Sequence, residues 1–390
     1  MTSKATFSPV FEPNRGFGIY VHWPYCAKIC PYCDFNVYVA KPAAYPDLLT
    51  AIQRDLAFWR SKTGARQVDT IFFGGGTPSL LSGKEIGGLI EAIDQLWGVK
   101  ADAEVSLEAN PDDAHRFQDI STSGVTRLSL GVQSLRDEAL TFLGRNHSVA
   151  EALSAVDAAR GLFASLSLDF IYALPKQTQE DWQEDLGQIT RMGADHLSLY
   201  ELTIEQRTAF AKAVERGAWR PADEDACADL YDLTQDVMRS AGYPAYEISN
   251  HARNNQHQAQ HNIIYWKSGD WVGVGPGAHG RLTFDGARYE TIAARRPQDY
   301  AAAIGASGNG STTMKTLSHE DIAFERIAMG MRLLEGMPTA DFEEPAGRSI
   351  NKANALQLKE DGLLQMSDTD LSLTPEGQLL ADYIARKLAE

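Results

Sequence analysis

Short apolar runs alternate along the first half of the chain with longer segments whose apolar residues recur at helical spacing. The runs predict strands at Gly18–His22, Thr70–Phe73, Glu104–Leu107, Arg127–Leu130, Ser165–Ile171 and His196–Tyr200. The longer segments predict helices near Ala44–Trp59, Lys84–Trp97, His115–Ser123, Val149–Gly161 and Glu180–Met192. Strands that alternate with helices are typical of parallel sheets, so the pattern predicts an α/β fold, either a barrel or a doubly wound sheet.

The alternation fades after Tyr200, and the rest of the chain has a different composition. Helices are predicted near Glu205–Arg216, Glu224–Ala241, His319–Glu335 and Leu379–Leu388. The segment 250–280 is rich in His, Asn, Gln and Gly, and 305–311 has the composition of a flexible linker. A predicted hairpin at 362–373 lies between the last two helices, which is a winged-helix-like α+β layout.

These changes predict three parts. We expect a core at 1–250, a His- and Gly-rich segment with a linker at 251–310 that closes the mouth of the core, and a small winged-helix-like domain at 311–390. Acidic residues outnumber basic ones in the last part, which argues against DNA binding there.

Composition excludes several classes of protein. The 390 residues include 36 Lys and Arg against 52 Asp and Glu, a net charge of −16, so a nucleic-acid partner is not expected. No run approaches the roughly 18 to 20 apolar residues of a transmembrane helix. Residues 1–15 contain no apolar run typical of a secretory signal, and we expect a cytoplasmic protein. A peripheral contact with a membrane stays open, although no basic amphipathic helix points to one.

Three of the four cysteines, Cys26, Cys30 and Cys33, fall within eight residues in the loop after the first predicted strand. Their Cys-x3-Cys-x2-Cys spacing lets three thiolates reach three corners of an iron–sulfur cube and leaves one iron open. Two alternatives are a zinc site completed by His22 and three packed small residues. The fourth cysteine, Cys227, lies in a helical pattern, where a core role is expected.

Polar and glycine residues follow the later predicted strands. Gly74, Gly75 and Gly76 precede Thr77 after the second strand, and glycines let a backbone approach a ligand closely. The remaining polar candidates are Glu108, Gln133, Arg145 and Asp169. Polar groups at the carboxyl ends of parallel strands converge on the ligand crevice.

The cysteine loop and the glycine motif resemble those of the radical S-adenosylmethionine (SAM) superfamily. The resemblance implies a partial (β/α)6 barrel and a [4Fe–4S] cluster on Cys26, Cys30 and Cys33, whose open iron binds SAM. The motif order is similar to the branch that contains oxygen-independent coproporphyrinogen III dehydrogenase. By that resemblance Tyr20, Gly75 and Glu108 contact the SAM on the cluster. A second SAM would contact Tyr32, Gly76, Thr77, Gln133, Arg145 and Asp169.

Two departures from the dehydrogenase pattern point to the haem chaperones of this branch. Phe35 stands where the dehydrogenase has a fourth cysteine, and only about fifteen residues precede Gly16. The run from His261 to Trp266 matches the chaperones' His-Asn-x-x-Tyr-Trp motif, and His261 and Tyr265 carry side chains that can ligate haem iron. A core hydrogen bond between these two residues, four apart on one helical face, is the alternative.

We therefore expect a haem chaperone that binds haem as cargo and delivers it to haem proteins such as respiratory cytochromes. It would carry the cluster and SAM and lack coproporphyrinogen dehydrogenase activity. The alternative function is oxygen-independent coproporphyrinogen III oxidation, a radical decarboxylation in haem biosynthesis.

Overall fold

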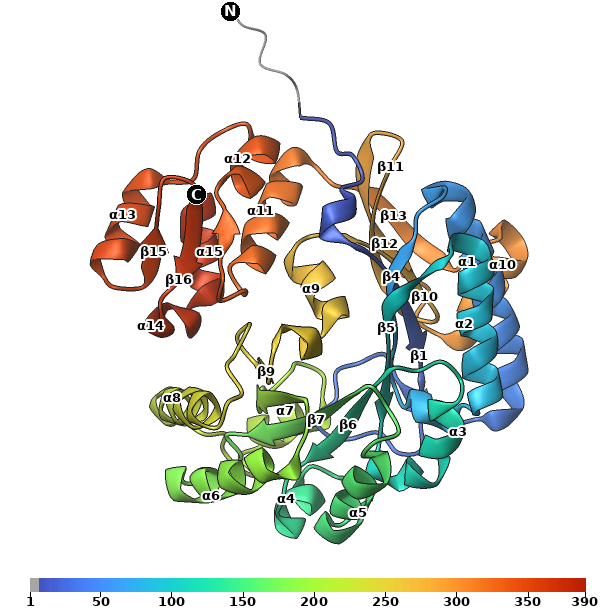
Figure 1. Ribbon diagram of the computed structural model, residues 1–390, viewed down its shortest axis with the longest axis horizontal. Coiled ribbons are helices and arrows are strands. Elements are labelled where there is room, and N and C mark those ends of the chain that lie inside the picture. Colours follow the sequence, from blue (N-terminus) through green and yellow to red (C-terminus); the bar gives the residue numbers. More distant parts are fainter. Residues whose placement is uncertain (1–6) are drawn as a thin grey trace, which may run out of the picture.

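The computed structural model describes residues 7–390, and one curved, open sheet is its largest element (Figure 1). Within this range the sheet has eleven strands in the order β13-β12-β11-β10-β1-β4-β5-β6-β7-β8-β9. The parallel core consists of β1 (Phe17–Trp23), β4 (Val68–Gly75), β5 (Val99–Ala109), β6 (Arg127–Gln133), β7 (Ser165–Tyr172) and β8 (His196–Glu201). The edge strands β9 and β13 do not pair with each other, so the barrel is partial. The predicted α/β fold and all six predicted strands are confirmed.

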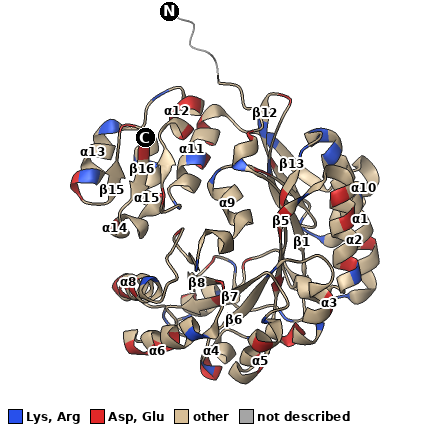
Figure 2. Cartoon of the chain, in the orientation of Figure 1, with Lys and Arg blue, Asp and Glu red and all other residues tan. Residues whose placement is uncertain are grey.

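Helices cover the convex side of this sheet (Figure 1). They are α1 (Tyr45–Thr63), α2 (Gly83–Trp97), α3 (Phe117–Ser121), α4 (Asp137–Phe142), α5 (Val149–Ala159), α6 (Gln179–Ile189) and α8 (Glu224–Ser240). Capping boxes begin α2 at Ser82, α5 at Ser148 and α6 at Thr178, because each hydroxyl accepts from the backbone N–H three residues on. Their apolar faces pack on the strands, around fully buried side chains such as Trp59, Phe117 and Trp182. Figure 2 shows many Asp and Glu residues on these outer helices, in keeping with the negative net charge.

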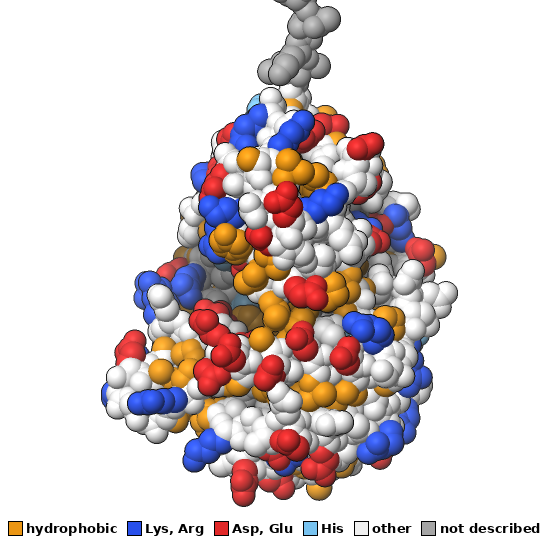
Figure 3. Space-filling model, turned by 90° about the vertical axis from the view of Figure 1, so that its left-hand side faces the viewer, with side chains coloured by type: hydrophobic (Ala, Val, Ile, Leu, Met, Phe, Trp, Pro, Cys, Tyr) orange, Lys and Arg blue, Asp and Glu red, His pale blue; other side chains and the backbone are white. Residues whose placement is uncertain are grey.

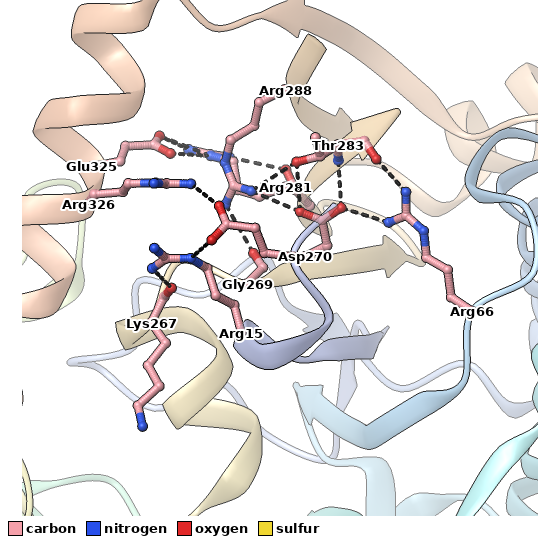
Figure 4. Close-up of polar contacts among 12 residues, drawn as sticks. Arg15, Arg66, Lys267, Gly269, Asp270, Arg281, Thr283, Arg288, Glu325 and Arg326 are labelled. Atoms are coloured by element: carbon pink, nitrogen blue, oxygen red, sulfur yellow. Dashed lines mark hydrogen bonds and ion pairs between the residues drawn. The ribbon is translucent and has the colours of Figure 1, made fainter. Parts of the chain in front are cut away.

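Further strands at both edges of the sheet were not predicted. At one edge, β10 (Asp270–Val274) pairs in parallel with β1 and is followed by the antiparallel strands β11 (His279–Phe284), β12 (Ala287–Ala293) and β13 (Ser311–Thr316). At the other edge, β9 (Asn250–Ala252) pairs antiparallel with β8. Charged residues in β10 and β12 obscured the strand pattern, since buried Asp270 pairs with Arg66 at 2.7 Å and with Arg288 at 2.8 Å (Figure 4). The glycine-rich run predicted as a linker instead ends α10 (Pro297–Ser307) and begins β13.

Helix α9 (Gln260–Trp266) lies on the concave side of the sheet, where the open barrel would otherwise expose its interior (Figure 1). It contacts β1, β4 and β10. Ile264 on α9 is buried, and a Cβ on Gly16 would lie 2.8 Å from its Cγ1. The helix therefore plugs the barrel beneath the cysteine loop.

The C-terminal module is an α+β unit with its own hydrophobic core. It comprises α11 (His319–Gly330), α12 (Ala340–Ala346), α13 (Lys352–Glu360), α14 (Pro375–Gln378), α15 (Ala381–Ala389) and a sheet of β14 (Met337–Pro338), β16 (Asp370–Leu373) and β15 (Leu364–Met366). The β15–β16 hairpin confirms the predicted one. The division of the chain at 250 and 310 stays a prediction.

Ion pairs hold this module against the sheet and the N-terminal segment (Figure 4). Glu325 on α11 accepts from the Arg281 guanidinium of β11 at 2.8 Å. Arg326, on the same helix, pairs with Glu12, and Arg15 donates to Asp341 of α12 at 3.0 Å. The contacts of Arg326 with Glu12 and of Arg15 with Asp341 join segments more than 300 residues apart in the chain.

Between residues 7 and 390, no helix combines the length and apolar character needed to cross a bilayer. The interpretation that residues 1–15 carry no secretory signal falls partly on 1–6, which lie outside the described residues.

Candidate functional site

A cavity of about 420 Å³ opens at the carboxyl ends of the parallel strands and reaches down to α9. Eleven of the predicted site residues line it: Cys26, Cys30, Tyr32, Cys33, Gly75, Gly76, Thr77, Glu108, Gln133, Arg145 and Asp169. They come from the cysteine loop and from the ends of four neighbouring strands. The tertiary structure thus brings together residues up to 143 positions apart, from Cys26 to Asp169.

The cysteine loop runs from the short strand β2 (Tyr25–Cys26) to β3 (Tyr38–Val39), which pair in parallel. Backbone bonds close it, from Tyr38 N to Pro24 O at 2.7 Å and from Ala40 N to Cys26 O at 2.8 Å. Asn36 within the loop donates to Pro276 O at 2.8 Å, which ties the loop to the turn after β10. The three thiols are therefore held on a loop with fixed ends.

The three thiols Cys26, Cys30 and Cys33 are free and half-buried. Burial raises the pKa of the Cys33 thiol to about 12 and also raises the pKa of Cys26. The protein alone thus favours protonated thiols, whereas a bound metal deprotonates its thiol ligands. Cationic iron would supply the missing positive charge.

The spacing of the thiols bears on the choice between a cluster and a zinc ion. Among the described residues, no three His, Cys, Asp or Glu side chains gather around one metal-ion position. Three thiolates that bind three corners of a cube stand farther apart than ligands of one ion. His22 does not complete a zinc site, because its Nδ1 lies 2.9 Å from Tyr20 Oη and its Nε2 lies 3.0 Å from Asn36 O.

The glycine motif packs the end of β4 against the cysteine loop. Gly76 N donates to Trp23 O at 2.6 Å, and Thr77 N donates to Tyr25 O at 2.8 Å. A Cβ on Gly76 would lie 2.6 Å from Tyr25 O, and a Cβ on Gly75, whose φ is +103°, would lie 2.5 Å from the His22 ring. Both positions therefore exclude side chains, and the reason is contact with the segment that carries Cys26.

Two half-buried carboxylates, Glu108 and Asp169, line the cavity, and neither forms an ion pair with a described residue. Burial and the nearby Asp169 charge raise the pKa of Glu108 to about 7, and its Oε2 accepts from Gly75 N at 3.0 Å. Burial also raises the pKa of Asp169, although hydroxyl donors, including Ser129 at 2.7 Å, oppose the shift. A cationic ligand between these carboxylates would stabilise their ionised forms.

Gln133 and Arg145 line the cavity beside the cysteine loop. Gln133 has a φ of 70°, rare for a residue with a side chain, and follows a register shift at the end of β6. Arg145 donates to Gly131 O at 3.1 Å, and its Nη1 lies 3.6 Å from Cys30 Sγ. The guanidinium therefore connects the end of β6 to the cysteine loop, where Tyr32 also lines the cavity.

The other three predicted site residues, Tyr20, His261 and Tyr265, lie behind the cavity wall. His261 is 1% exposed, its Nδ1 lies 2.6 Å from Thr70 Oγ1, and its Nε2 lies 2.7 Å from Tyr265 Oη. Burial lowers the pKa of His261 to about 3. The hydrogen bond expected on one helical face is present, and both ring nitrogens have protein partners.

The sequence interpretation missed the closed end of the cavity. Arg127 and His196, the first residues of β6 and β8, line it together with Asn262 of α9. Arg127 is 3% exposed, and an arginine at the start of an otherwise apolar strand was the available signal.

Hydrophobic side chains flank the open end. Ile29, Phe35 and Tyr200 line the cavity and are 43%, 59% and 43% exposed. A hollow between the C-terminal module and the barrel is visible in the space-filling view, bordered by hydrophobic and acidic side chains (Figure 3). A ligand with a flat apolar face would find matching surface at these three residues.

Comparison with known families gives two matches. Residues 20–189 match the radical SAM superfamily, and residues 317–380 match the HemN C-terminal domain. The first range contains the cysteine loop and the ends of the parallel strands through β7.

Several curated proteins are similar over nearly the whole chain. Radical S-adenosyl methionine domain-containing protein 1, mitochondrial, from Danio rerio is 35% identical, over 94% of this chain and 85% of that protein. "Heme chaperone HemW" from Escherichia coli K12 is 38% identical over 83% of this chain and 84% of that protein. The protein of the same name from Mycobacterium tuberculosis H37Rv is 34% identical over 96% of this chain and 95% of that protein.

Among solved structures, coproporphyrinogen III oxidase (HemN) from Escherichia coli matches with a TM-score of 0.79. The match covers 96% of this chain and 90% of that chain at 22% sequence identity. At this identity the likeness shows a shared fold.

Proposed function

The chain belongs to the radical SAM superfamily, in the family of the proteins named heme chaperone HemW, and on this premise we propose that it binds haem and delivers it to haem proteins. The observation that carries the proposal is identity of 32 to 38% to these relatives over most of the chain. Phe35, in place of a fourth cysteine, supports it.

The superfamily implies a [4Fe–4S] cluster and SAM. Cys26, Cys30 and Cys33 would hold the cluster, because their thiols share one cavity wall without converging on a single ion position. When bound, the pair supplies one-electron chemistry at the open iron. The role of the protein is to fix the loop and to exclude competing reactions.

One side of the cavity carries carboxylates that suit the cationic groups of SAM. Glu108 and Asp169 lack ion-pair partners there, and the sulfonium and ammonium groups of SAM are cations. We assign Tyr20, Gly75 and Glu108 to the SAM on the cluster, with Tyr20 acting from behind the wall through His22. Tyr32, Gly76, Thr77, Gln133, Arg145 and Asp169 are assigned to a second SAM.

The haem would enter at the exposed side chains of Ile29, Phe35 and Tyr200. His261 and Tyr265 remain our candidates for iron ligands. Because each is the hydrogen-bond partner of the other, iron ligation by either requires that this 2.7 Å bond open. Replacement of His261 by Ala and of Tyr265 by Phe, compared by the absorption spectrum of the bound haem, identifies the ligand.

The three parts of the chain would divide the work. Residues 1–250 would hold the cluster and SAM, 251–310 would close the barrel mouth, and 311–390 would cover the barrel's open side. Respiratory cytochromes are the acceptor class we propose, and the cytoplasm is the proposed location.

The test uses anaerobically reconstituted full-length protein in two assays. In the first, haem is loaded and an apo-haemoprotein acceptor is added; we expect transfer, seen as the acceptor's spectrum. In the second, SAM, a reductant and coproporphyrinogen III are supplied; we expect no vinyl product. Vinyl product at repeated turnover without haem transfer would establish the alternative, coproporphyrinogen III oxidation, whose support here is the fold shared with HemN.

A further inference from the structure

The cavity is deeper than the sites assigned to the cluster and SAM. Those assignments lie at the carboxyl ends of the strands, but the lining continues down β6 from Gln133 to Arg127. Six steps along a strand, at about 3.3 Å each, correspond to roughly 20 Å. Along β6, Arg127 lies two residues from Ser129, the register partner of Glu108, and four from Gly131, the partner of Asp169, so the closed end is nearer to these two carboxylates than to Gln133.

Arg127 is a buried cation at this closed end with an unused donor. Its Nη1 donates to His257 O at 2.9 Å and to Ser165 Oγ at 3.2 Å, and Glu104 Oε2 lies 3.6 Å from the same nitrogen. Its Nη2 is buried and has no hydrogen-bond partner among the described residues. Buried polar groups in proteins are almost always paired, so the unpaired nitrogen requires an explanation.

Glu104 is the one described carboxylate within ion-pair distance of Arg127, and His196 and Asn262, which line the same end of the cavity, carry no negative charge. His196 is 1% exposed and neutral, since burial and the Arg127 charge hold its pKa well below the usual range, and its nitrogens already face Ser167 and Tyr246. Asn262 lines the same region, and its side chain forms no hydrogen bond with a residue in 7–390. Arg127 and Asn262 thus both line this end of the cavity, and each carries a donor without a protein partner among the described residues.

Two acidic groups, Glu104 and Asp169, lie near enough for their charge to act on Arg127, and both also accept hydrogen bonds from other residues. Glu104 approaches Arg127 on the Nη1 side, and its other oxygen lies 3.4 Å from His261 N. Asp169 accepts from Ser129 and Ser167. A guanidinium N–H forms a charge-assisted hydrogen bond with a carboxylate, and Nη2 is the buried Arg127 nitrogen that has no partner among the described residues for its N–H groups.

We propose that Arg127 anchors an organic carboxylate at the closed end of the cavity, with the Asn262 amide as a second donor. This inference rests on the proposed function for the identity of the ligand. A porphyrin carries propionates, and SAM carries an amino-acid carboxylate, so two ligands could supply the group. For a porphyrin propionate to reach Arg127, the porphyrin must extend from the exposed side chains Ile29, Phe35 and Tyr200 to the closed end of the cavity.

The test compares protoporphyrin IX with its dimethyl ester, which lacks the free carboxylates. Both are free of iron, so iron ligation cannot contribute. Fluorescence titration of the full-length protein and of Arg127→Met should show binding of the diacid weakened about tenfold or more, as expected for a lost charge-assisted bond, with the ester unaffected. Equilibrium dialysis with SAM is the second arm, and a loss confined to SAM would assign the carboxylate to that ligand.

Three further variants control for folding. Arg127→Lys keeps the charge and should retain most of the selectivity for the diacid. The double variant Arg127→Met, Glu104→Gln removes the Glu104 charge that Arg127→Met leaves without a partner. It should lose the selectivity for the diacid over the ester, as Arg127→Met does. Glu104→Gln alone should tighten binding of the diacid. Circular dichroism and iron content check that each variant is folded and loaded.

The outcomes separate this inference from the proposed function. The role of Arg127 would be overturned if Arg127→Met lost equal affinity for the diacid and the ester. It would also be overturned if Arg127→Met bound protoporphyrin IX, its dimethyl ester and SAM as the wild type does. If the wild-type protein transfers haem and Arg127→Met binds every probe with wild-type affinity, this inference alone would be overturned. Absence of haem transfer, with a selective loss of SAM binding in Arg127→Met, would overturn the chaperone function alone.

Discussion

Substitution of Gly76 by alanine tests whether the glycine motif positions the cysteine loop. The new Cβ would lie 2.6 Å from Tyr25 O and 2.8 Å from Trp23 O, both backbone atoms. Ordinary contact at 3.4 Å requires a shift of about 0.8 Å, the difference between 3.4 and 2.6 Å. Because Cys26 follows Tyr25 directly, this shift would move a thiol that we assign to the cluster.

The expected cost follows from overpacking, about 1 to 3 kcal/mol of the free energy of unfolding. At about 2 °C per kcal/mol for a protein of this size, the unfolding midpoint should fall by about 2 to 6 °C. Iron per chain and cluster absorbance after anaerobic reconstitution should both fall relative to wild type. Calorimetry and iron analysis measure the two effects separately.

Gly88→Ala is the matched control, since Gly88 lies within α2 and a Cβ there would have no neighbour within 4 Å. It should retain full iron content and gain about 0.5 to 1 kcal/mol, because alanine favours helix more than glycine does. A Gly76→Ala protein with wild-type midpoint and wild-type iron content would refute the reasoning.

Three further predictions follow from single side chains. Cys30→Ala should abolish the cluster absorbance while Cys227→Ala, in α8, retains it, and a cluster retained without Cys30 contradicts the ligand assignment. Asp270→Asn should cost about 3 to 5 kcal/mol in urea unfolding, because it leaves Arg66 and Arg288 buried without their shared partner; a loss below about 1 kcal/mol contradicts this. Burial raises the pKa of Asp55 from 3.8 to about 6, so the folded state holds this proton more tightly. As pH rises from about 4 to 6 its contribution should therefore lower stability by up to about 3 kcal/mol, and Asp55→Asn should remove that part of the pH dependence, measured by urea unfolding across the range.

The electrostatic layout of the cavity is consistent with a site for more than one ligand. Unpaired carboxylates, Glu108 and Asp169, lie toward the strand ends, whereas the unpaired donor of Arg127 lies at the floor. A cationic group of a ligand would lie near these carboxylates, and an anionic group would lie near Arg127. The two positions are about two to four strand residues apart. This separation of charge orients any ligand that carries both.

The predicted elements and the actual ones agree where local pattern reports burial. The β4 strand and the α2 helix are examples, since both carry their apolar residues at the period of their own geometry. The pattern failed for β10 to β13, whose charged residues include the buried ion pair of Asp270 with Arg288. An ion pair between residues that are distant in the sequence leaves no pattern in a short stretch of that sequence.

The site shows the same division. The cysteine spacing and the glycine triplet were recognisable because the chemistry of a cluster loop requires them close together in the chain. His261 was recognisable as a motif member, but its burial against Thr70 and Phe72 depends on where α9 packs. Arg127 escaped notice because an arginine at a strand end is ordinary until the surroundings leave one of its donors unpaired.

The sequence by itself determined the alternation of strands and helices, the three-thiol loop and the membership of a superfamily, because each depends on residues near one another in the chain. The tertiary structure decided which groups share the cavity, which nitrogens of His22 and His261 are already bonded, and which donor of Arg127 is free. Those properties are set by burial and by contacts between residues as far apart as Arg127 and Asn262. Desolvation and hydrogen-bond satisfaction depend on the whole environment of a group, and only the folded chain supplies that environment.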